Sequence, residues 1–163
     1  MNNLNKEIYY VQNPALGSAI LWRFIYGYYS LESQPVPFPL LFIVLPIILR
    51  EDLSSIIAST QKKSGLSKVS EKLFSEKKND NLYSISNVAI AMRPLTLDSF
   101  NIGIATNLYG IDKGSALVYP MRETKLPNIP PSVKSLLNSS EKLGTWCAQL
   151  SLREISNLLK VRF

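Results

Sequence analysis

The stretch Pro35–Leu49, PVPFPLLFIVLPIIL, is an uncharged apolar run whose placement decides the fold of the chain. The uncharged window around it, residues 33–49, holds 17 residues, whereas a membrane-spanning helix needs about 20 apolar residues. Four prolines in the run remove backbone donors and bias the residues before them toward extended backbone, so any helix here is short and kinked. The length therefore favours a buried core segment, and membrane insertion is the lesser alternative.

Composition argues against the common enzyme and metalloprotein classes. The chain of 163 residues carries a net charge of +6 and has no histidine, which removes the usual general base and the commonest metal ligand. Its one cysteine, Cys147, has no partner for an internal disulfide, and no phosphate-binding or metal-binding motif is present. The N-terminus lacks a signal-peptide layout. We expect an intracellular, cytoplasmic protein without catalytic site, cofactor or metal.

The N-terminal part begins with a strong helix signal. Asn13 is a favoured N-cap residue and Pro14 is favoured at the first helical position, which predicts a helix to about Leu31. Its apolar residues cover most of the circumference, and such a helix is buried on most sides. The Pro35–Leu49 run and a short helix near residues 52–60 follow, so surplus apolar surface is expected in this part.

A lysine-rich segment follows over residues 61–81. It predicts a solvated helix with Leu66, Val69 and Leu73 turned inward. Its basic face could also contact a phosphate backbone, although no aromatic side chains interleave with the lysines for base stacking. The candidate contacts to DNA backbone are Lys62, Lys63, Lys68 and Lys72.

The middle of the chain predicts two helices and a hairpin. One helix is expected over Leu82–Arg93, stopped by Pro94, and a second one capped by Thr96. Two short apolar runs then flank a turn at residues 112–115, which is typical of a β-hairpin. Helices followed by a hairpin suggest a winged-helix-like unit, but the second helix carries Asp98 and no basic residue, so protein is the expected contact rather than a DNA groove.

The C-terminal part predicts a helix pair. A proline-bearing linker over residues 121–131 precedes a long helix with an apolar face, and Ser151 to Glu154 form a capping box for a short last helix. Arg162 and Phe163 end the chain beside Val161. An arginine next to an aromatic residue is the composition of an interface anchor, which predicts that this tail docks on a partner.

Together these elements predict a mainly α fold with one β-hairpin (α+β), in which a winged-helix-like helix–helix–hairpin unit is embedded between N- and C-terminal helices. We expect one domain over residues 1–163. Its parts are an N-terminal helical part (13–60), the winged-helix-like part (64–120) and the C-terminal helix pair (131–160).

Four segments of the chain resemble a known family. They are the opening Asn13-Pro14-Ala15 with its apolar helix, the run PLLFIVLPIIL at 39–49, the helix–hairpin block at 82–119, and EKLGTWCAQLSLREISNLLKVRF at 141–163. In this order they resemble the middle component of three-component ABC defence systems, the small subunit of Lamassu-type complexes built around an SMC-like ATPase. The chain departs from that family at three positions. The family tends to have glycine where this chain has Lys160, proline where it has Phe163 and arginine where it has Thr145.

The resemblance implies a non-enzymatic scaffold or adaptor subunit. It implies a hetero-oligomer in which two copies of an SMC-like ABC ATPase and an effector, commonly a nuclease, act in defence against phages and plasmids. DNA would reach this subunit indirectly through the complex, and no membrane is involved. A stand-alone winged-helix DNA-binding protein and a membrane-associated subunit are the alternatives. The candidate partner-interface residues are Trp22, Phe24, Phe38, Leu41, Phe42, Trp146, Arg162 and Phe163.

Overall fold

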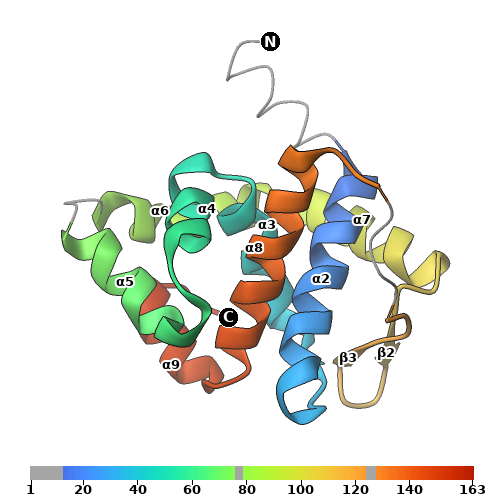
Figure 1. Cartoon of the computed structure of the whole chain (residues 1–163). Coiled ribbons are helices and arrows are strands. Elements are labelled where there is room, and N and C mark those ends of the chain that lie inside the picture. The colour runs from blue at the N-terminus through green and yellow to red at the C-terminus, as the bar shows by residue number, and fades with distance from the viewer. Residues whose placement is uncertain (1–12, 76–78, 124–127) are drawn as a thin grey trace.

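A computed structural model of the chain describes residues 13–75, 79–123 and 128–163 (Figure 1). The predicted class, mainly helical with a hairpin, is confirmed, and the hairpin gains a third strand. The elements in chain order are α2 Pro14–Glu32, β1 Val36–Pro37, the 3-10 helix η1 Phe38–Ile43, α3 Val44–Ile48, α4 Glu51–Ser59, the 3-10 turn η2 Lys62–Ser64, α5 Gly65–Ser75, α6 Asn79–Ala91, α7 Arg93–Ala105, β2 Tyr109–Asp112, β3 Leu117–Pro120, α8 Pro131–Cys147 and α9 Leu152–Leu159.

Helices α2 and α8 form the centre of the fold and run side by side in the same direction (Figure 1). Helix α2 begins as predicted, because the Asn13 side chain accepts a hydrogen bond from the backbone N–H of Leu16 at 3.0 Å. The two backbones come very close at Gly27 and Gly144. A Cβ at Gly144 would lie 2.1 Å from the carbonyl oxygen of Phe24, so this packing requires glycine.

The Pro35–Leu49 run lies in the core rather than in one helix. It divides into β1, η1 and α3, and all residues from Ile43 to Leu49 are buried. The prolines explain the division, since each interrupts the hydrogen-bond pattern of a long helix. No helix within residues 13–75, 79–123 and 128–163 is long and apolar enough to cross a membrane.

The three-stranded antiparallel sheet has the order β1-β3-β2. The predicted hairpin is confirmed, with Ile111 opposite Val118. Strand β1 was not expected from the sequence; it pairs Val36 with Val118 and so joins the hairpin to the N-terminal part. The winged-helix arrangement is not confirmed, because the hairpin pairs with β1 and packs against α2.

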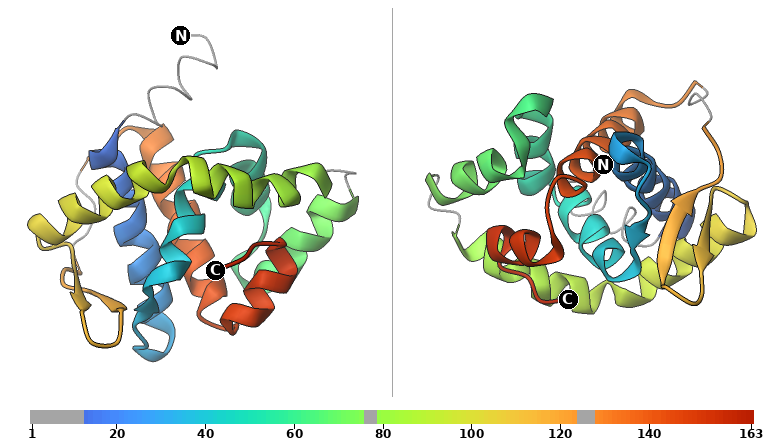
Figure 2. Two further views of the ribbon diagram at one scale, coloured as in Figure 1. Left: turned by 180° about the vertical axis from the view of Figure 1, so that it is seen from behind. Right: turned by 90° about the horizontal axis from the view of Figure 1, so that it is seen from below.

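Helices α6 and α7 lie nearly end to end and cross α2 and α8 on the side that faces the viewer in the left view of Figure 2. The expectation that Thr96 caps the second helix was wrong. Helix α7 already begins at Arg93, with Met92 as N-cap and Pro94 in the first turn, and Thr96 is buried inside it. Proline suits the first turn because the N–H groups there have no intrahelical acceptor.

The C-terminal helices pack on the lysine-rich segment. In α5 the side chains of Leu66, Val69 and Leu73 are buried as predicted. The predicted capping box starts α9, since the Ser151 N–H donates to Glu154 Oε2 at 2.7 Å and the Glu154 N–H donates to Ser151 Oγ at 3.2 Å. One contiguous cluster of buried side chains includes residues from all three parts of the chain.

Candidate docking groove

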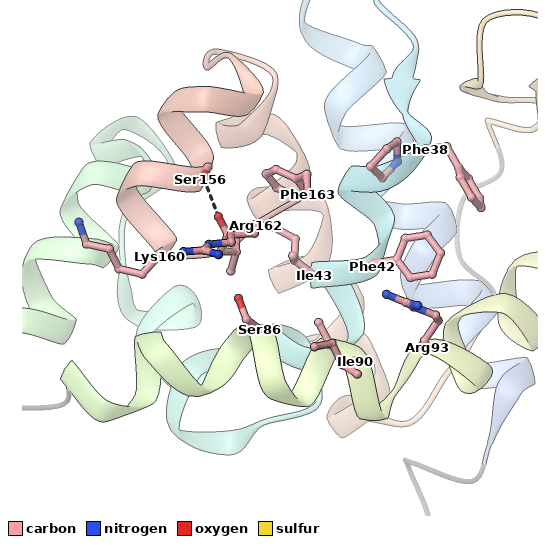
Figure 3. A pocket seen from close by; sticks show the side chains of 13 residues that line it. Phe38, Phe42, Ile43, Ser86, Ile90, Arg93, Ser156, Lys160, Arg162 and Phe163 are labelled. Carbon is pink, nitrogen blue, oxygen red and sulfur yellow. Dashed lines mark hydrogen bonds between the residues drawn. The ribbon is translucent and has the colours of Figure 1, made fainter.

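An open groove of about 910 Å³ lies between η1, α6 and the C-terminal tail (Figure 3). We call it the tail groove. Three segments far apart in the sequence form it, because α6 passes beside η1 and α9 turns the chain end back toward both. Its lining residues are Phe38, Pro39, Phe42, Ile43, Ser86, Ala89, Ile90, Arg93, Ser156, Lys160, Val161, Arg162 and Phe163.

The floor of the tail groove is apolar, and part of it is exposed. Ile43 is buried, whereas Ile90 is 63% exposed and Phe163 is 46% exposed. At one end the Phe38 ring meets the rings of Phe42 and Phe100 edge to face, with centroids 5.4 and 5.0 Å apart. Two exposed apolar side chains gathered in one hollow, with charged residues at its edges, are typical of a surface that a partner covers.

The tail is held in place by the end of α9. Lys160 adopts a left-handed backbone with φ of 55°, which ends the helix and reverses the chain. Val161 then returns to the core at 2% exposure, and its carbonyl accepts a hydrogen bond of 2.5 Å from Ser156 Oγ. Arg162 and Phe163 are thereby positioned at the groove rather than left to fray.

Apart from the main-chain carboxylate of Phe163, the charged groups that line the tail groove are cations. They are Arg93, Lys160 and Arg162, and each is exposed. None of the three forms an ion pair with another residue in the part of the chain that the structure describes. Exposed guanidinium groups on an apolar floor offer charged hydrogen-bond donors to an incoming carboxylate.

The candidate interface residues separate into two groups. Trp22, Phe24, Leu41 and Trp146 are at most 4% exposed and belong to the chain's own core, where Trp146 Nε1 donates to the Lys62 carbonyl at 2.6 Å. Their aromatic or apolar character does not distinguish core from interface, which is why the sequence could not separate them.

The second group lines the tail groove and comprises Phe38, Phe42, Arg162 and Phe163. Their contact with a partner stays a prediction. Sequence reasoning missed Ile90, Arg93 and Lys160. The sequence gives one indication of Ile90, because it is a large apolar residue among small residues in the helix before Pro94. Only the position of η1 shows that Ile90 faces the tail groove.

The lysine-rich segment presents a mixture of free and engaged cations. Lys62, Lys63 and Lys68 are exposed, and Lys68 pairs with Glu71 at 2.9 Å. Lys72 Nζ donates to Thr60 Oγ1 at 2.9 Å. Contact of these lysines with a DNA backbone stays a prediction.

Cys147 is the one thiol of the chain and is fully buried in α8. Burial raises the pKa of its thiol to about 12, because the apolar surroundings disfavour the thiolate. Within the described residues no group of three or more His, Cys, Asp or Glu side chains is arranged to hold a metal ion. The residues that line the tail groove offer apolar contact and positive charge, which suits binding.

The whole chain, residues 1–163, matches the family described as ABC-three component (ABC-3C) system Middle Component 3. The chain belongs to this family. No curated protein and no solved structure matches it. The resemblance to a middle component of a three-component ABC system is thus confirmed, and a Middle Component 3 protein has partner subunits by the nature of such a system.

Proposed function

We propose that this Middle Component 3 protein is a non-enzymatic scaffold that links an SMC-like ABC ATPase, of the Lamassu type, to an effector nuclease. In this proposal two ATPase copies assemble with it, and it helps to hold the effector inactive until foreign DNA engages the ATPase. The complex would serve in defence against phages and plasmids. Membership in a three-component ABC family supports the presence of partners.

The observation that carries the proposal is the tail groove. Ile90 and Phe163 are exposed in this groove although the rest of the chain is well packed. The three cations beside them form no ion pair with any residue that the structure describes. Residues that fill a pocket on a partner surface commonly dominate binding free energy, with losses of about 2 kcal/mol or more on truncation. We therefore assign the tail groove as the surface that a partner subunit covers.

Co-purification tests this proposal. The tagged protein is co-expressed with the other two components of its three-component ABC system, and the partners retained are measured. Ile90→Asp should release one partner, because it places a carboxylate on the apolar floor. The matched control is Leu31→Asp, since Leu31 is also exposed, at 42%, but lies in the last turn of α2 and does not line the groove.

A second variant removes the groove contribution of the tail. Deletion of residues 162–163 keeps the buried Val161 side chain. Because the deletion converts the Val161 carbonyl that binds Ser156 into a terminal carboxylate, the melting temperature is measured alongside assembly. The deletion should weaken assembly about 30-fold, which corresponds to about 2 kcal/mol. Equal retention of both partners by wild type, Ile90→Asp and the deletion, with unchanged melting temperatures, would reject the tail groove as the docking surface.

A further inference from the structure

The cations of the tail groove stand at its two ends. Ser86, Ile90 and Arg93 are spaced four and three residues apart. They therefore lie along one face of α6 and the start of α7, over a length of about 10 Å. Arg93 lies beside Phe42 at one end, whereas Lys160 and Arg162 lie at the other (Figure 3). The apolar floor lies between them.

This charge pattern restricts what can cover the groove. A second copy of the chain, docked groove to groove about a two-fold axis, would bring Arg93 and Arg162 against the same cations of its partner. The net charge of +6 adds to that repulsion. An occupant with carboxylates at both ends satisfies all three cations, and its apolar residues remove Ile90 and Phe163 from water.

We propose that the tail groove binds an amphipathic segment of a partner subunit in which bulky apolar side chains are flanked at both ends by Asp or Glu. The inference rests on the proposed function and names the chemistry of the partner segment. Arginine suits this role because its guanidinium can form paired hydrogen bonds with a carboxylate. Such rim pairs fix orientation and speed association, and salt screens them.

The backbone of Lys160 explains how the tail reaches the groove. Its φ of 55° lies in the left-handed region, which glycine adopts without steric cost and lysine does not. The chain accepts this conformation at a residue that lines the groove. This conformation ends α9 and turns Val161 back to the core, so it positions Arg162 and Phe163 at the groove.

Charge reversal tests the proposal in the assembled complex. Arg93→Glu combined with Arg162→Glu should reduce partner retention at least tenfold, and Arg93→Gln with Arg162→Gln should reduce it less. The control is Lys113→Glu, because Lys113 is exposed in the hairpin turn outside the groove. Retention by the wild type should fall between 50 and 500 mM NaCl, as expected for screened ion pairs.

Cross-linking identifies the occupant. Ile90→Cys introduces an exposed thiol, whereas the native Cys147 is buried and too weakly acidic to compete. A thiol-linked benzophenone at position 90 should join a partner peptide that carries apolar residues flanked by Asp or Glu. Charge reversal of those acidic residues should restore binding to the Arg93→Glu, Arg162→Glu variant.

The outcomes separate the inference from the proposed function. If Ile90→Asp releases the partner but charge reversal leaves retention unchanged, the groove is a docking site and the acidic occupant is wrong. A cross-linked segment without carboxylates leads to the same conclusion. If neither Ile90→Asp nor charge reversal affects retention, the tail groove is not the docking surface, and the acidic occupant fails with it. If the wild type itself retains no partner, the proposed function fails.

Discussion

Gly144→Ala is the substitution that most directly tests the packing of α2 against α8. At this position an added methyl group would lie 2.1 Å from the Phe24 carbonyl oxygen and 2.9 Å from the Tyr28 backbone nitrogen. Both neighbours are helical backbone, so neither can move away as a side chain could. At Gly27 the situation is reciprocal, because a methyl group there would lie 2.2 Å from the Glu141 carbonyl oxygen.

The expected magnitude follows from two opposing effects. The helices must separate by about 1 Å to admit the methyl group, and overpacking of a close-packed interior costs about 1–3 kcal/mol. The cost should lie near the upper limit because the contact is with backbone. Alanine recovers about 1 kcal/mol because it favours helix over glycine. We expect a net loss of about 2 kcal/mol, or a melting temperature lowered by about 4–8 °C for a domain of this size.

Thermal unfolding followed by circular dichroism measures this loss. Ser135→Ala is the control, since Ser135 is exposed in the same helix and the change should not destabilise it. The double variant Gly27→Ala, Gly144→Ala should cost less than the sum of the single changes, because the first methyl group already separates the helices. A Gly144→Ala protein that melts at or above the wild-type temperature would refute the reasoning.

Three further predictions concern single side chains. Cys147 should not react with alkylating reagents at pH 8 in the folded protein and should react fully in denaturant, because burial raises the pKa of its thiol to about 12; rapid labelling of the native protein would contradict this. Hydrogen bonds from the Ser151 backbone N–H and hydroxyl lower the pKa of Glu154. The Glu154 carboxylate therefore stabilises the fold at pH values above the ordinary glutamate pKa near 4.3. This stabilisation is lost as the pH falls through the lower pKa that Glu154 has in the folded protein. The melting temperatures of wild type and Glu154→Gln should therefore differ at pH 7 and begin to converge as the pH falls below about 4.3; a difference that stays constant in acid would show that the carboxylate charge does not contribute. Lys142 Nζ donates hydrogen bonds to three carbonyls at the end of α4, including that of Thr60 at 2.9 Å. Lys142→Met should therefore lower the free energy of unfolding by about 1–2 kcal/mol, measured by denaturant titration. An unchanged denaturation midpoint would show that water replaces these hydrogen bonds.

Local chemistry made several elements predictable from the sequence. Asn13 and Ser151 cap helices through hydrogen bonds that span three residues, and such signals need no knowledge of the rest of the fold. The inward face of α5 follows from the spacing of Leu66, Val69 and Leu73 alone. The hairpin likewise depends on a turn between two adjacent apolar runs.

The remaining features depend on contacts between distant segments. Val36 lies in a two-residue strand that exists because Val118 lies opposite, so no local pattern predicts it. Pro94 was interpreted as a stop, but the same residue type also favours the first turn of a helix, which misplaced the cap at Thr96. The tail groove needs η1, α6 and the chain end together, and only their packing shows that Ile90 is left in water while Trp146 is not.

The separation of α2 from α8 along the chain has a consequence for protein synthesis. About 100 residues lie between the end of α2 and the start of α8, which a ribosome adds in about 5–20 s at common elongation rates. During that interval the nascent α2 has apolar side chains on most of its circumference and lacks its principal neighbour. The face of α2 that packs on α8 therefore stays exposed until α8 has been translated, whereas the contacts of α2 with α7 can form earlier.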